Sequence, residues 1–214
     1  MVYSRVRALL TAAIIVGITP TVVFAAANTE VTAKKTTLPG YRGVAFGESG
    51  ASAHAKFKAL FGPGTNEAGD VFYTGEVAGY PDTVVFPRFI NNKLVHVAHG
   101  FRGQDSAIKV FLDLNNKLTA TYGECTQGGW GWYKDGNPTA DLADTVEYDT
   151  DQVLAFAEEG RAFLKSVWEF EGGNYLKLET EQLPNGDLWV SLNYGCPSLI
   201  QQETKQGNGR KPEL

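Results

Sequence analysis

The sequence predicts an α+β domain in which a mostly antiparallel sheet carries about three helices packed on one face. Three segments repeat apolar residues at intervals of three and four, which is the period of an amphipathic helix. Around them lie segments rich in Val, Phe and Tyr that are joined by short turns, which favours hairpins over crossover connections. The predicted order of elements is β-α-β-β-β-α-β-α-β-β-β.

The first half is expected to hold a short strand, a helix and a group of strands. Phe57 and Leu60 fall on one face of the helix, and Gly62 ends it. Asn91 and Asn92 can adopt the positive φ of a tight turn, which predicts a hairpin around them. The expected bounds are 41–46 for the strand, 51–61 for the helix, 70–80 and 82–90 for the next strands, and 84–101 for the hairpin.

The clearest element is a helix from 106 to 122. Phe111 and Leu114 belong to its apolar face, Asp105 or Ser106 can cap its start, and Gly123 ends it. A helix that ends at a glycine therefore precedes a group of strands twice, at 62 and at 123. This similarity lies in the order of elements and not in residue identity.

The remaining elements are a strand, a third helix and a final β-meander. The strand runs through Trp130 and Trp132 toward a turn at Asp135-Gly136. The third helix is expected over 151–164. The meander is expected to consist of strands 166–171, 175–182 and 188–194, with turns at 172–174 and 184–186.

The first 27 residues have the layout of a secretory signal peptide. Arg5 and Arg7 precede an apolar run from 8 to 23, and small residues follow at 25–27. Pro20 and the alanine-rich end disfavour the alternative, an uncleaved membrane anchor. No later apolar run approaches the ~20 residues needed to span a bilayer. We therefore expect an exported bacterial protein, periplasmic or secreted, without stable membrane insertion after cleavage.

These patterns divide the chain into four parts. The expected organisation is a signal peptide at 1–27, a flexible lead-in at 28–39, a single α+β domain at 40–200 and a disordered tail at 201–214. Removing the signal peptide takes away two arginines and no acid, so the net charge changes from −5 to −7. An acidic surface does not suit phosphate backbones or anionic headgroups, so we expect no nucleic-acid partner.

Cys125 and Cys196 are the only cysteines. An even number of cysteines in an oxidising compartment predicts a disulfide, whereas a redox-active pair is expected as C-x-x-C. The loop that this bond would close corresponds to about 4 kcal/mol of stabilisation in the chain-entropy model. Two free thiols are the alternative.

Five different short motifs are spread along the body of the chain. They are Gly43-Val44-Ala45-Phe46-Gly47, Leu60-Phe61-Gly62, Phe89 through Lys93-Leu94, Leu118 through Tyr122-Gly123, and Trp168. In this layout the chain loosely resembles small exported bacterial proteins of unknown function over most of residues 41–194. The resemblance implies a fold and a compartment, and it carries no catalytic residue to this chain.

Two arrangements are candidates for a catalytic or metal-binding site. Ser49 sits between a strand and a helix, as in a nucleophile elbow, but position 51 is Ala instead of the Gly that this motif needs. All the histidines precede residue 100, which is the wrong chain order for such a hydrolase. His96 and His99 lie three apart on a strand and so point to opposite faces. We expect no catalytic residue, no metal site and no cofactor.

An acidic run precedes the third helix. It lacks the glycine and the glutamate that an EF-hand loop requires at fixed positions. Its members at the helix start are explained by capping and by the helix dipole. The run comprises Asp141, Asp144, Glu147, Asp149 and Asp151.

The most unusual local sequence surrounds Trp130, Trp132 and Tyr133. Alternation along a strand places Trp130 and Trp132 on the same face, with glycines between them. Paired indoles could bind a sugar ring or a partner protein, and Tyr133 extends that candidate binding surface. The alternative is a core face packed under a helix.

Export, acidity, the tryptophan-bearing strand and the lack of a catalytic constellation together predict a function class. We expect a non-enzymatic protein that binds a protein or a component of the cell envelope. The alternatives are a small envelope or extracellular hydrolase and a carbohydrate-binding module.

Overall fold

The computed structural model describes residues 37–208 apart from 68, 102–105, 135–136, 139–148 and 184–185. The described helices are α2 (Gly50–Phe61), α3 (Ala107–Tyr122), α4 (Thr150–Glu158) and α5 (Pro197–Asn208). The strands are β1 (Gly40–Tyr41), β2 (Val44–Ala45), β3 (Thr65–Glu67), β4 (Asp70–Val77), β5 (Tyr80–Ile90), β6 (Lys93–Phe101), β7 (Gln127–Lys134), β8 (Asn137–Pro138), β9 (Ala162–Glu169), β10 (Tyr175–Gln182) and β11 (Leu188–Gly195).

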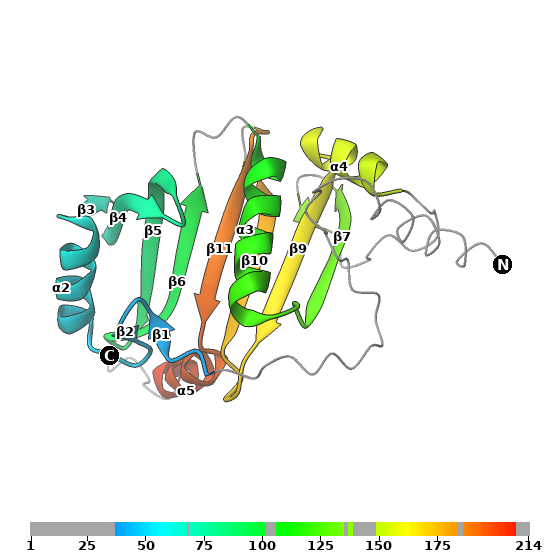
Figure 1. The fold of residues 1–214 in the computed structure, drawn as a ribbon. Coiled ribbons are helices and arrows are strands. Elements are labelled where there is room, and N and C mark those ends of the chain that lie inside the picture. Colours follow the sequence, from blue (N-terminus) through cyan, green and yellow to red (C-terminus); the bar gives the residue numbers. More distant parts are fainter. Residues whose placement is uncertain are drawn as a thin grey trace.

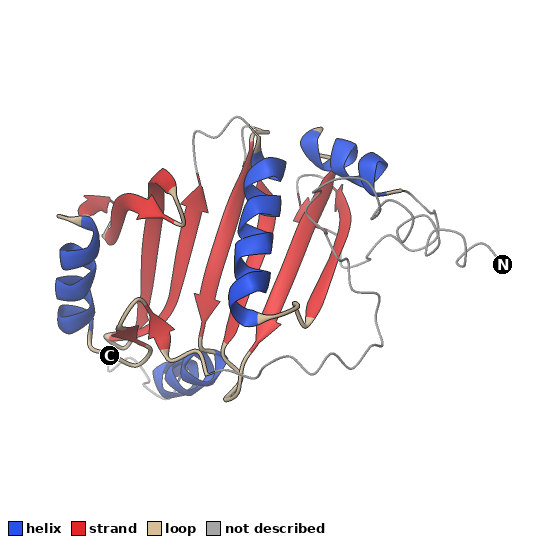
Figure 2. Ribbon diagram, viewed as in Figure 1, coloured by secondary structure: helices blue, strands red, loops and turns tan. Residues whose placement is uncertain are grey.

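The strands form one large sheet and one small hairpin. The nine-stranded sheet has the order β3-β4-β5-β6-β11-β10-β9-β7-β8, and β1 pairs with β2. Neighbouring strands of the sheet are antiparallel throughout. Figures 1 and 2 show helices beside this sheet, with α3 lying across its centre. The predicted α+β class with a mostly antiparallel sheet is confirmed.

The sheet consists of two similar halves that meet at β6 and β11. In the first half α2 precedes β3-β4-β5-β6, and in the second α3 precedes β7 and the meander β9-β10-β11. The two helices end on glycines with nearly the same backbone angles, φ 86° and ψ −167° at Gly62 and φ 86° and ψ −172° at Gly123. The last strands of the halves pair with each other, from His96 opposite Gly195 to Phe101 opposite Val190. The similarity in element order is therefore a repeat of architecture.

The two faces of the large sheet differ in composition. The face toward α3 is apolar: Leu176, Leu178 and Leu192 are buried there and belong to the same core as Phe111 and Leu114 of the helix. On β10 and β11 the residues between them point to the other side, because successive side chains of a strand alternate. We call this opposite side, at the centre of the sheet, the polar face. On the central strands it carries Val84, Phe86, Arg88, His96, Ala98, Tyr175, Lys177, Glu179, Glu181, Trp189, Ser191 and Asn193, and on β9 it carries Lys165.

The third helix is shorter than predicted. Its start is as expected, because Asp149 caps it in a reciprocal capping box with Gln152. The helix ends at Glu158, however, and Gly160 then turns the chain with a φ of 70°. Residues from Ala162 onward form β9, which pairs with β10 and β7 and has buried residues on both of its faces. A short apolar segment with both faces buried fits the helical period as well as the strand period, so the expected helix over 151–164 was wrong in its second part.

Four further segments differ from expectation. The strand predicted over 41–46 is the hairpin of β1 and β2, which reverses at Arg42 and Gly43 with positive φ. The short strands β3 and β8 at the sheet edges were not predicted. The tail expected to be disordered from 201 continues the helix α5 to Asn208. The other helices, the hairpin at Asn91-Asn92 and the final meander lie close to their predicted positions.

The predicted disulfide between Cys125 and Cys196 is not formed, and both are free, buried thiols. Cys125 lies beside β9, since the next residue, Thr126, donates its N–H to the Val167 carbonyl. Cys196 lies beside β6, where its N–H binds the Val95 carbonyl. The sheet order places β10 and β9 between β11 and β7, and three strand spacings of about 4.8 Å exceed the reach of a disulfide.

The N-terminal expectations concern residues beyond those described. The signal peptide at 1–27 and most of the lead-in lie outside the described residues. Among the described helices, none combines the length and the apolar composition of a membrane span.

Candidate functional site

The structure separates the three aromatic residues singled out in the sequence. Trp130 and Trp132 share the helix-covered face, where their rings meet edge to face with centroids 5.1 Å apart. Trp132 also packs on Phe156 of α4, with ring centroids 5.3 Å apart. Both indoles are partly buried against the core, as the core alternative expects. A flat pair of exposed rings, which stacking on a sugar requires, is not formed here.

Tyr133 points to the opposite side of the sheet. Its hydroxyl donates a hydrogen bond to the Thr180 carbonyl at 2.7 Å, and its ring contacts Phe163. Burial raises the pKa of Tyr133 to about 12, which keeps the hydroxyl protonated as a donor. Tyr133 therefore does not form one surface with the tryptophans.

The candidate residues for catalysis or metal binding are also far from one another in the structure. Ser49 occupies the N-cap position of α2. His96 lies on the polar face and His99 on the face toward α3, as the strand alternation predicts. Of the acidic run, Asp141, Asp144 and Glu147 lie outside the described residues. Within the described ranges no group of three or more Cys, His, Asp or Glu residues is placed to hold a metal ion.

The polar face carries a continuous row of hydrogen-bonded side chains. The Trp189 indole N–H donates to Glu181 Oε2 at 3.1 Å, and the Ser191 hydroxyl donates to the other oxygen of the same carboxylate. Asn193 in turn donates from Nδ2 to Ser191 Oγ at 3.0 Å, and its side chain lies close enough to His96 to act on the pKa of that imidazole. The row joins β10 and β11, and His96 of β6 lies at its end, so this face combines side chains from both halves of the fold.

Two aromatic rings lie over glycines at the edges of this row. Trp189 covers Gly100, and Tyr175 covers Gly195, so that a Cβ at either glycine would overlap the ring. A glycine thus allows the ring to approach the backbone closely. Tyr175 and Trp189 each keep part of their surface accessible. Together with the polar row they form a surface of aromatic and hydrogen-bonded groups.

Cationic groups lie near His96. Arg88 stands directly opposite His96 in the β5–β6 ladder and is exposed. Lys177 forms an ion pair with Glu179 and retains 30% of its side-chain exposure. Burial, with the positive charges of Arg88 and Lys177, lowers the pKa of His96 to about 4. His96 is therefore neutral at pH 7 and lies at the end of the row without charge.

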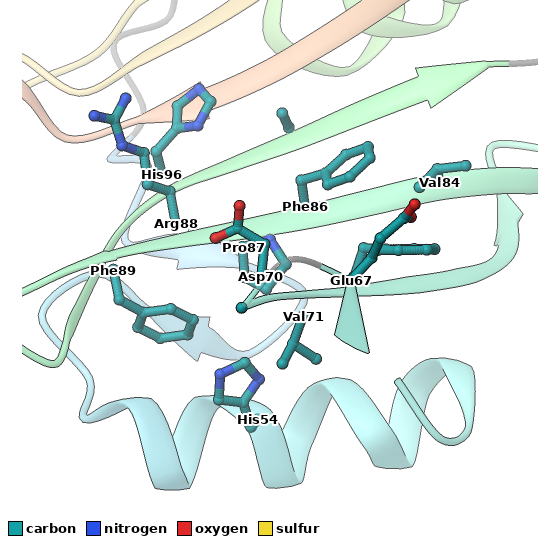
Figure 3. A pocket seen from close by; sticks show the side chains of 13 residues that line it. His54, Glu67, Asp70, Val71, Val84, Phe86, Pro87, Arg88, Phe89 and His96 are labelled. Carbon is teal, nitrogen blue, oxygen red and sulfur yellow. The ribbon is translucent and has the colours of Figure 1, made fainter. Parts of the chain in front are cut away.

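A pocket of about 930 Å³ adjoins the row where β4 diverges from β5 (Figure 3). Strand β4 pairs with β5 only as far as Tyr73 opposite Val85, and the start of β4 pairs with β3 instead. The lining combines aromatic residues with charged ones from α2 and the strands. It comprises His54, Glu67, Gly69, Asp70, Val71, Phe72, Val84, Phe86, Pro87, Arg88, Phe89, His96 and Ala98. His96 and Arg88 thus belong to both the pocket and the polar face.

His99 lies behind the polar face as a buried neutral base. It is 1% exposed, and its ring lies under Tyr41 and Tyr194 with centroids 4.7 and 5.4 Å away. The Leu192 carbonyl accepts a hydrogen bond from Nδ1 at 3.0 Å, and Nε2 has no hydrogen-bond partner among the described residues. Burial lowers the pKa of His99 to about 4, well below its ordinary value of 6.5.

This pKa predicts a pH-dependent stability. Below pH 6.5 the unfolded chain binds a proton at His99 that the folded protein does not bind until about pH 4. The free energy of unfolding therefore falls as the pH falls, by about 2 kcal/mol from this residue between pH 7 and pH 5. Urea unfolding at both pH values should show that His99→Gln removes this part of the loss.

A second measurement covers the case in which the variant does not fold. Imidazole resonances of the unmodified protein should show His99 neutral at pH 5. Protonation of His99 near pH 6.5, or an equal pH-dependent loss in His99→Gln, contradicts the prediction.

Sequence reasoning missed the residues of the polar face. Tyr175, Trp189 and His96 are far apart in the chain, and only the pairing of β11 with both β6 and β10 brings them together. A usable signal was present in the alternation of 175–182, where polar residues alternate with Leu and Thr. Gly100 within the predicted hairpin was a second signal, because an interior glycine marks a close approach.

Comparisons with family models, with curated proteins and with solved structures find no significant match. The resemblance to small exported bacterial proteins therefore stays a prediction.

Proposed function

We propose that this chain is an exported, non-enzymatic protein that binds a partner protein through the polar face. The observation that carries the proposal is the pair of aromatic rings, Tyr175 and Trp189, lying on glycines beside a hydrogen-bonded row. Tyr, Trp and Arg are the residue types enriched where protein interfaces concentrate their binding energy, and Arg88 completes that set here.

The rigidity of this surface supports the proposal. Glu181 accepts hydrogen bonds from both Trp189 and Ser191, so the indole is held in place before any partner arrives. A surface that is already ordered loses less conformational entropy on binding, which favours affinity. The mixture of charges from Arg88, Lys177 and Glu179 favours a protein surface over a uniformly charged polymer or membrane.

Crosslinking in the producing cell tests this proposal. A photoreactive amino acid replaces Lys165 of β9, which stands opposite Glu179 on the polar face. The control replaces Lys109, an exposed lysine on α3 at the other side of the sheet. We expect a discrete crosslinked protein from position 165 and none of it from position 109. No product from position 165, or the same products from both, contradicts the proposal.

Export is tested separately at the N-terminus. Small residues before the cut place cleavage after Ala27 or Ala25. Mass spectrometry of the protein recovered outside the cytoplasm should find a chain that begins at Asn28 or Ala26. An intact N-terminus on a protein found only in the cytoplasm contradicts export. In that case a crosslinked partner would be a cytoplasmic protein.

A further inference from the structure

The pocket between β4 and β5 has two chemically different parts. Phe72 and Phe86 form one wall with ring centroids 5.6 Å apart, and Phe89 packs on His54 with centroids 4.7 Å apart. Two carboxylates, Glu67 and Asp70, stand at the turn between β3 and β4, where these residues are paired. Figure 3 shows these acidic side chains among the residues that line the pocket, together with Phe86 and Phe89.

The carboxylates are available for a guest. Both residues are exposed, and within the described part of the chain no ion pair involves Glu67 or Asp70. Other carboxylates of the fold are engaged, such as Glu48 with Lys56 and Asp113 with Lys117. An acidic rim over aromatic walls is complementary to a side chain with an apolar stem and a cationic head.

We propose that this pocket receives an arginine or lysine side chain of the partner protein. The stem of that side chain lies along Phe72 and Phe86, and its cationic head reaches Glu67 and Asp70. This inference rests on the proposed function and specifies the chemistry of the partner at one end of the polar face. The acidic character of the whole chain favours approach of such a cationic segment.

Two neighbouring features agree with a cationic side chain as the occupant. Pro87 lies on the segment of β5 that β4 leaves, and its missing N–H weakens this edge as a template for an added strand. Arg88 and His96 line the same pocket, and His96 is uncharged at pH 7, so the two carboxylates outnumber the one Arg or Lys side chain of the lining. A guest that enters by its side chain, with a cationic head, agrees with both features.

Two small probes of equal shape test this inference on the purified protein. N-acetyl-arginine amide carries the guanidinium, and N-acetyl-citrulline amide replaces it with a neutral urea group. Titrations followed by NMR should shift the ring resonances of Phe72, Phe86 and Phe89 with the arginine probe. The citrulline probe should bind on the order of tenfold more weakly, because charge-assisted hydrogen bonds to two carboxylates are lost.

Variants assign the preference to the two carboxylates. The double change Glu67→Gln with Asp70→Asn should make the two probes bind equally. Glu76→Gln is the matched control, because Glu76 is an exposed carboxylate on β4, the strand of Asp70, and does not line the pocket. It should leave the preference unchanged.

Equal binding of the two probes to the unmodified protein, or absence of shifts at the three phenylalanines, overturns the inference. An equal loss of preference in Glu76→Gln overturns it as well. If crosslinking from position 165 succeeds while the probes fail, the proposed function stands and the inference about the pocket falls.

Discussion

Phe57→Ala should lower the free energy of unfolding by about 3–5 kcal/mol, the range for removing a large buried aromatic side chain. Phe57 is 0% exposed in α2, where its ring lies 5.5 Å from Tyr73 and 6.3 Å from Tyr41 between centroids. The truncation leaves a cavity between the helix, β4 and the hairpin of β1 and β2, and the surrounding rings can collapse into it only in part. Urea unfolding at pH 7 measures the change.

Leu60→Ala is the matched control in the same helix. Leu60 is 42% exposed, so its truncation should cost less than about 1 kcal/mol. If Phe57→Ala and Leu60→Ala lower the free energy of unfolding by similar amounts, α2 does not pack on the sheet as described.

Trp189→Ala should weaken binding of the captured partner by about 30-fold or more, which corresponds to the loss of an interface hot spot. The indole ring covers Gly100, and its N–H binds Glu181, so truncation removes a rigid apolar contact and releases the carboxylate. The change is measured as the ratio of the dissociation constants of the purified partner for the variant and for the unmodified protein.

Two further variants separate binding from folding. Trp189→Phe keeps a ring over Gly100 and should recover a large part of the affinity. Glu76→Gln, away from the polar face on the edge side of the sheet, should bind as the unmodified protein does. Full affinity in a folded Trp189→Ala variant is incompatible with binding through this face.

The sequence predicted the fold well where local signals are strong. The helix α3 has a capping serine, a clear apolar stripe and a terminal glycine, and Ser106 indeed accepts a hydrogen bond from the Lys109 N–H. Asn91 and Asn92 adopt the positive φ expected of a tight hairpin turn. Prediction failed at 159–164, where Gly160 ends the helix early and burial on both sides hides the strand period.

The candidate site could not be predicted because it depends on strand order. Nothing local in Trp189 or Tyr175 shows that their neighbours across the ladder are glycines, or that β11 lies between β6 and β10. Of the tryptophans that stood out in the sequence, Trp132 packs on Phe156 of α4, and Trp130 contacts Trp132. Both indoles are partly buried, so their unusual local sequence does not by itself identify a binding surface.

Hydroxyl-radical footprinting with the partner present tests most directly which face of the sheet is bound. Trp168, which is 2% exposed, serves as the unreactive reference in the free protein and in the complex. We predict that the partner protects Trp189 and Tyr175 from oxidation and leaves Trp130 and Trp132 at their rates in the free protein. Protection of Trp130 and Trp132 with no change at Trp189 and Tyr175 would contradict binding through the polar face.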